Sequence, residues 1–156
     1  MGFAEPRIVT MPERIAAGLS QRFTMQSVAE IPALWAGLHA REWVIADEVP
    51  GALFGVSYGF DGEGGFDYLA GVEVSQVGAV PRGVSHVTLA AGEYAVFSHC
   101  GEMADIPRLF AHIFRTWFPQ SGYTSAEGAV FERYPSGPAD AEGRYSYEVW
   151  APIRMV

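Results

Sequence analysis

Two stretches of the chain place apolar residues at helical spacing. The first, "IPALWAGLH" (31–39), has them at i, i+3, i+4 and i+7: Ile31, Leu34, Trp35 and Leu38. The second, "IPRLFAHIFRTW" (106–117), continues the same stripe: Ile106, Leu109, Phe110, Ile113, Phe114 and Trp117. This spacing gathers apolar side chains on one face, so it predicts one amphipathic helix in each stretch.

Prolines and one acid mark the expected ends of these helices. Pro32 and Pro107 lie near the starts, where a missing N–H is tolerated, and Asp105 is a candidate N-cap. Pro119 follows the second stripe in "WFPQSG". Because the residue before a proline is pushed out of the helical region, we expect the second helix to stop there.

After each predicted helix come two strand-like runs joined by a turn-rich linker. The first pair is "ALFGVSYGF", linker "DGEGG", and "FDYLAGVEV" (52–74). The second pair is "GAVFERY", linker "PSGPADAEG", and "RYSYEVWAPI" (128–153). Glycine and proline mark both connections, which predicts two hairpins.

The chain also repeats itself. "IPALWAGLH" resembles "IPRLFAHIF", and a strand-like segment with an Ala-Ala-Gly step precedes each, at 14–23 and 88–99. A strand-helix-strand-strand unit therefore occurs twice, at about 6–76 and 84–156, within one domain of residues 1–156. We predict an α+β fold: a combined antiparallel sheet with both helices packed on one side, approximate two-fold symmetry, and a cleft between the halves.

Composition and charge restrict the classes of partner. The chain of 156 residues is 49% hydrophobic with a formal net charge of −8, and it has no run of basic residues. Direct binding of nucleic acid is therefore disfavoured, whereas a cationic small molecule or a basic protein surface would be attracted. The single cysteine, Cys100, and the lack of a membrane-length apolar run favour a cytoplasmic protein that does not enter membranes.

Glu132 is the acid that most needs an explanation. In "AVFERY" side-chain alternation places Val130, Glu132 and Tyr134 on one face and Phe131 on the other. If Phe131 fills the core, Glu132 is a solvated surface acid. If its own face is enclosed, Glu132 is the acidic floor of an aromatic cleft, and a bound cation offsets its desolvation.

Other aromatic residues are candidates for the walls of such a cleft. On the neighbouring strand Tyr147 occupies one face, whereas a second acid, Glu148, shares the other face with Trp150. Either of these two faces could line the same wall of the cleft as Glu132. Ordinary core packing is the alternative for every aromatic candidate. The complete set of candidate ligand-binding residues is Glu132, Tyr134, Tyr68, Trp117, Tyr147, Trp150 and Trp35.

A metal site and a reactive cysteine are not favoured. His86, His99, Cys100 and His112 show none of the spacings of familiar metal sites, so we expect neither a metal nor a cofactor. No Cys-His-Asn arrangement can be argued from the sequence, which makes Cys100 an inert thiol.

Over nearly its whole length the chain resembles the GyrI-like small-molecule-binding domains, also called AraC-type effector-binding domains. The matching stretches are "IPALW", "FDYLAGVEV", "AAGEYAVFSHCG", "IPRLFAHIFRTWFPQSGY", "FERY" and "YEVWAPI". The resemblance implies a cleft between two repeats in which an acid at the position of Glu132, ringed by aromatics, favours cationic amphipathic compounds.

Family members often follow a DNA-binding helix-turn-helix domain and act as effector sensors of transcription regulators. Here the similar segment begins at about residue 6, so we expect a stand-alone form without direct DNA binding. Three hypotheses remain: a non-catalytic binder that senses or sequesters hydrophobic cations; a hydrolase of electrophilic natural products with Glu132 as general base; and a gyrase-inhibitor-type module that binds a protein partner. The ligand and the oligomeric state stay open.

Overall fold

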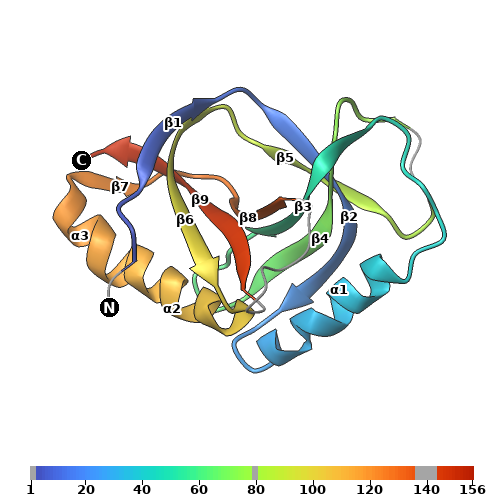
Figure 1. The fold of residues 1–156 in the computed structure, drawn as a ribbon, viewed down its shortest axis with the longest axis horizontal. Coiled ribbons are helices and arrows are strands. Elements are labelled where there is room, and N and C mark those ends of the chain that lie inside the picture. Colours follow the sequence, from blue (N-terminus) through green and yellow to red (C-terminus); the bar gives the residue numbers. More distant parts are fainter. Residues whose placement is uncertain (1–2, 79–80, 136–143) are drawn as a thin grey trace.

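The computed structural model describes residues 3–78, 81–135 and 144–156. In this part of the chain nine strands form a strongly curled sheet, and two helical stretches pack on one side of it (Figure 1). Every strand pairing is antiparallel. The predicted α+β class, with helices on one side of an antiparallel sheet, is therefore confirmed. None of the helices in these ranges is long and apolar enough to cross a bilayer.

The elements follow the repeat predicted from the sequence. The strands are β1 (Arg7–Met11), β2 (Arg14–Phe23), β3 (Glu48–Tyr58), β4 (Phe66–Val74), β5 (Ser85–Leu89), β6 (Gly92–Gly101), β7 (Tyr123–Ser125), β8 (Val130–Pro135) and β9 (Tyr145–Met155). The helical segments are η1 (Val28–Glu30), α1 (Ile31–His39), η2 (Met103–Asp105), α2 (Ile106–Ala111), η3 (His112–Trp117) and α3 (Phe118–Ser121). Both predicted hairpins are present, β3–β4 and β8–β9. Residues 136–143 of the second predicted linker lie outside the described residues.

The strand order has approximate two-fold symmetry, because equivalent strands of the two repeats occupy equivalent positions from the two edges of the sheet. It runs β1-β6-β9-β8-β3-β4-β2-β5, with β7 paired to β9. The two repeats thus meet at β3 and β8 in the middle of the sheet. The repeats also exchange one strand each. β1 precedes β2 in the chain but pairs with β6 of the second repeat, and β5 precedes β6 but pairs with β2 of the first repeat.

The second helix ends within the expected stretch 117–122, but it continues past Pro119, where the proline rule places its end. Pro119 lies in the first turn of α3, and the helical path continues from α2 through η3 to Ser121. The reason is that η3 is a wide π-helical stretch, in which the N–H of Phe118 bonds to the carbonyl of Ile113, five residues back. A wider turn accommodates a proline that an α-helix interior would reject. The path ends at Gly122, which has a φ of 79°.

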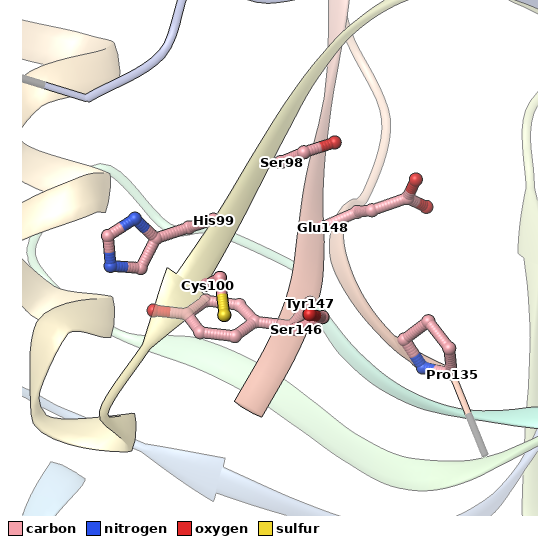
Figure 2. Close-up of a pocket in the computed structure, with 7 residues that line it drawn as sticks. All are labelled: Ser98, His99, Cys100, Pro135, Ser146, Tyr147 and Glu148. Atoms are coloured by element: carbon pink, nitrogen blue, oxygen red, sulfur yellow. The ribbon is translucent and has the colours of Figure 1, made fainter. Parts of the chain in front are cut away.

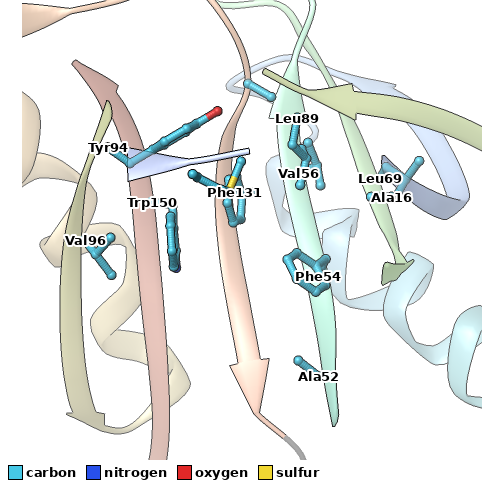
Figure 3. Close-up of a cluster of buried hydrophobic side chains, with 12 residues drawn as sticks. Ala16, Ala52, Phe54, Val56, Leu69, Leu89, Tyr94, Val96, Phe131 and Trp150 are labelled. Atoms are coloured by element: carbon cyan, nitrogen blue, oxygen red, sulfur yellow. The ribbon is translucent and has the colours of Figure 1, made fainter. Parts of the chain in front are cut away.

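Both faces of the central strands are buried. The curled sheet encloses one apolar face, where Phe54 and Phe131 pack with Tyr94 and Trp150 (Figure 3). The helices cover the other face, where Val130, Tyr134 and Tyr147 belong to a second cluster. The interpretation of Glu132 as a solvated surface acid is therefore wrong, although its premise about Phe131 holds. Phe131 does fill the core, and Glu132 on the opposite face is buried as well, with 5% of its surface exposed.

Candidate functional site

Glu132 lies at the seam between the two repeats. It stands on β8, opposite Gly55 of β3 and Val149 of β9. Its Oε1 accepts two hydrogen bonds, from the Tyr68 hydroxyl at 2.9 Å and from the Tyr134 hydroxyl at 2.7 Å. The Tyr68 oxygen in turn accepts a hydrogen bond from Trp35 Nε1 at 3.1 Å. A carboxylate, two phenols and an indole from three different elements, β8, β4 and α1, thus converge on one point.

Gly55 makes room for this arrangement. A Cβ atom at this position would collide with the Tyr68 hydroxyl and would come within 2.8 Å of Glu132 Oε1. Gly55 was not among the residues expected at the site. A glycine inside a strand is a signal of close approach by another group, and this signal could have found it.

Burial controls the electrostatics of Glu132. Loss of water raises its pKa to about 7, although the hydrogen bonds from Tyr134 and Tyr68 act in the opposite direction. No ion pair among the described residues includes Glu132. Burial, and then the neighbouring carboxylate, raises the pKa of both tyrosines, so they remain protonated donors. Above neutral pH Glu132 is therefore negatively charged, and no ion pair among the described residues balances this charge.

Four aromatic residues are grouped around this charge. Tyr68 and Tyr147 are buried, while Trp35 and Tyr134 are half-buried. The ring of Tyr134 is 5.5 Å from that of Trp35 and 5.8 Å from that of Tyr147. We call Glu132, Tyr68, Tyr134, Trp35 and Tyr147 the glutamate cluster. Five of the seven residues predicted for ligand binding therefore lie together.

The other two predicted residues lie elsewhere. Trp117 stacks on Tyr123 at 6.0 Å and meets the edge of Phe97 at 5.2 Å, within the core under the second helix. Trp150 stacks on Phe131 at 5.4 Å, on the sheet face opposite Glu132. Since strand alternation separates Tyr147 from Trp150, only one of them can share the face of Glu132.

The second candidate acid, Glu148, has a different environment. It pairs with Arg7 at 2.8 Å and with Arg133 at 3.7 Å, and it accepts a hydrogen bond from Trp150 Nε1 at 3.0 Å. Burial acts to raise the pKa of Glu148, but the hydrogen bonds from Arg7 and Trp150 outweigh it and lower this pKa. Its charge is thus matched within the protein, unlike that of Glu132.

A shallow, open pocket lies over β6 and β9 (Figure 2). Its volume is about 360 Å³, and it is lined by Ser98, His99, Cys100, Pro135, Ser146, Tyr147 and Glu148. Glu132 is not among these residues. His99 Nε2 is 2.8 Å from Asp105 Oδ2, and the same carboxylate pairs with Arg108. Asp105 does occupy the N-cap position of α2, but its side chain makes these contacts instead of capping the helix.

The candidate metal ligands are dispersed. His86 lies on β5, His99 and Cys100 on β6, and His112 at the start of η3. Within the described ranges no three side chains of metal-binding type come together. His99 is instead engaged by Asp105, and His112 contacts the rings of Phe3 and Phe97.

Comparisons with known proteins agree on one family. The model of the GyrI-like small molecule binding domain matches residues 4–154. The transcriptional regulator BrlR of Pseudomonas aeruginosa is 31% identical over 153 residues, covering 94% of this chain and 54% of BrlR. The chain spans about half the length of the curated relatives that it matches.

Two solved structures share the fold across almost the whole chain. SAV2435, solved bound to tetraphenylphosphonium, has a TM-score of 0.78 at 19% identity, with 97% of this chain and 94% of that chain covered. The integron cassette protein VCH_CASS2 from the mobile metagenome of Vibrio cholerae has a TM-score of 0.73 at 20% identity, with 97% of each chain covered.

Proposed function

The chain belongs to the GyrI-like small-molecule-binding family, and from this premise we propose that it binds hydrophobic cations at the glutamate cluster without transforming them. One observation carries the proposal: Glu132 is buried among aromatic rings, and no ion pair of the described residues balances its charge. A buried carboxylate is costly unless it is paired, so a cation that reaches it gains the interaction that the free protein lacks.

The half-buried rings supply the remaining affinity. The rings of Trp35 and Tyr134 are 5.5 Å apart, and the Tyr134 hydroxyl donates a hydrogen bond to Glu132 in the free protein. We expect the guest to displace the Tyr134 side chain and to meet ring faces on the way in. Each cation–π contact contributes about 0.5 to 2 kcal/mol. The tetraphenylphosphonium complex of SAV2435 and the regulator BrlR support a role in sensing or sequestering such compounds.

A comparison of a cation with a neutral ligand tests this function. Titration calorimetry at about pH 8, where Glu132 is ionised, should show that tetraphenylphosphonium binds at least about tenfold more tightly than triphenylphosphine oxide, because only the cation forms a charge-assisted contact. Mass spectrometry should recover the phosphonium unchanged. Equal affinities for the two ligands, or no binding of either, would count against the proposal.

A hydrolase is the second candidate, and the pKa of Glu132 favours it. A carboxylate with a pKa of about 7 is suited to act as a general base on water, and the Tyr68 and Tyr134 hydroxyls are within hydrogen-bond distance of it. Incubation with a mixture of electrophilic natural products distinguishes the two functions. Only a hydrolase would yield a product heavier by one water.

A further inference from the structure

The hydroxyl of Tyr147 is a buried donor without an acceptor. Tyr147 lies on β9 with 1% of its surface exposed, and its hydroxyl has no hydrogen-bond partner among the described residues. Native proteins satisfy nearly all of their buried polar atoms, so a buried hydroxyl that lacks a partner calls for an explanation. No other buried side-chain nitrogen or oxygen in the described ranges is left without a partner.

The polar residues that contact the Tyr147 ring are already engaged in other interactions. Tyr147 pairs across the strands with His99, whose ring is 5.6 Å away, and both side chains project to the same side of the sheet (Figure 2). His99 bonds to Asp105, and Asp105 also pairs with Arg108. On the other side the Tyr134 ring lies 5.8 Å from that of Tyr147. A guest that displaces Tyr134 to reach Glu132 therefore also uncovers Tyr147.

The surrounding charges determine which acceptor fits. Burial, followed by the negative charges of Asp105 and Glu132, raises the pKa of Tyr147 to about 12, while Arg108 acts in the opposite direction. The phenol is therefore protonated at physiological pH and acts as a donor. Because two carboxylates face it, an anionic acceptor would be repelled, whereas a neutral carbonyl, ether or hydroxyl oxygen would not.

We infer that Tyr147 is a specificity-determining residue that donates a hydrogen bond to a neutral oxygen acceptor on the bound cation. The inference rests on the proposed function and narrows its ligand class. The preferred guests are hydrophobic cations that carry a carbonyl, ether or hydroxyl group, and purely hydrocarbon cations are weaker ligands.

Two matched phosphonium ions test this inference. The 4-oxopentyl triphenylphosphonium ion carries a ketone, and in its 4-methylpent-4-enyl counterpart a C=CH₂ group replaces the C=O. We expect the wild-type protein to bind the ketone about fivefold to tenfold more tightly in calorimetric titrations, which is the usual net effect of one hydrogen bond. Tyr147→Phe should lose this preference and bind the two ions about equally.

Further measurements separate the possible outcomes. Tyr123→Phe, on β7 and outside the glutamate cluster, should keep the preference for the ketone. The melting temperature of Tyr147→Phe should equal or exceed that of the wild type, because the deleted hydroxyl has no partner. Equal binding of the two ions by the wild type, or a preference that survives in Tyr147→Phe, overturns the inference and leaves the cation site intact. If neither ion binds, the proposed function is overturned as well.

Discussion

Replacing Glu132 with Gln is expected to weaken tetraphenylphosphonium binding by about 30-fold to 1,000-fold at about pH 8. The variant retains an oxygen that accepts the hydrogen bonds from Tyr68 and Tyr134, so the shape of the cluster is conserved. Only the negative charge is lost. Since the charge lies in a buried, aromatic setting, its interaction with a desolvated cation is stronger than that of an exposed pair. Titration calorimetry measures the change in Kd.

Two control measurements accompany Glu132→Gln: the stability of the variant and its affinity for a neutral ligand. The pKa of Glu132 is raised from 4.5 to about 7 in the folded protein. The folded state thus holds this proton more tightly than the unfolded state does, and Glu132 lowers stability as pH rises from about 4.5 through 7. Glu132→Gln avoids this loss, so at about pH 8 it should be at least as stable as the wild type. The affinity for triphenylphosphine oxide should change little.

Glu148→Gln is the control variant for Glu132→Gln, because it removes the same charge from a different site. It removes a carboxylate from the opposite face of the sheet, where Arg7 and Arg133 already balance the charge. It should lower stability and preserve phosphonium binding, the reverse of the pattern for Glu132→Gln. Equal loss of phosphonium affinity in both variants would show that net charge, and not the buried acid, governs binding.

Replacing Phe131 with Ala should lower the free energy of unfolding by about 3 to 5 kcal/mol. Phe131 is 1% exposed and fills the enclosed face of the sheet, with the ring of Trp150 at 5.4 Å and those of Phe54 and Tyr94 at 5.7 Å. Truncation leaves a cavity that strands on both sides cannot readily close. Equilibrium denaturation in urea measures the loss.

An exposed phenylalanine calibrates this measurement. Phe60 is 57% exposed and stacks on Phe66 at the surface. Its replacement by Ala should change stability by no more than about 1 kcal/mol. If Phe131→Ala costs no more than Phe60→Ala, the enclosed core on that side of the sheet is not what stabilises the fold.

Local patterns in the sequence located both helices and both hairpins, but they missed β1 and β7 and did not separate β5 from β6 within the expected segment 88–99. Helical spacing placed the first helix at residues 31–39, where α1 is found, and glycine-rich linkers identified both hairpins. The exchange of β1 and β5 between the repeats is set by contacts distant in sequence, which no local pattern encodes. The rule that predicted a helix end before Pro119 was overridden because η3 widens the preceding turn.

The candidate site was predictable to the same extent. Alternation correctly placed Glu132 and Tyr134 on one face and Phe131 on the other. Burial of both faces depends on the curl of the sheet, which the sequence does not show. The approach of Tyr68 to Glu132 across β3 depends on strand register and on Gly55. Trp117 and Trp150 were candidates for the same reason as Trp35, as aromatic residues in amphipathic elements. Only the tertiary fold shows that Trp35 lies in the glutamate cluster and that the other two do not.

Proton release on binding tests the central claim most directly, that Glu132 is the charged group which receives the cation. Calorimetric titration of tetraphenylphosphonium in two buffers of different ionisation enthalpy counts the protons released. At about pH 6 most Glu132 side chains are protonated, so binding should release about one proton per ligand, and at about pH 9 almost none. Glu132→Gln should release none at either pH. Binding at about pH 6 without proton release, or an equal release from Glu132→Gln, would contradict the claim.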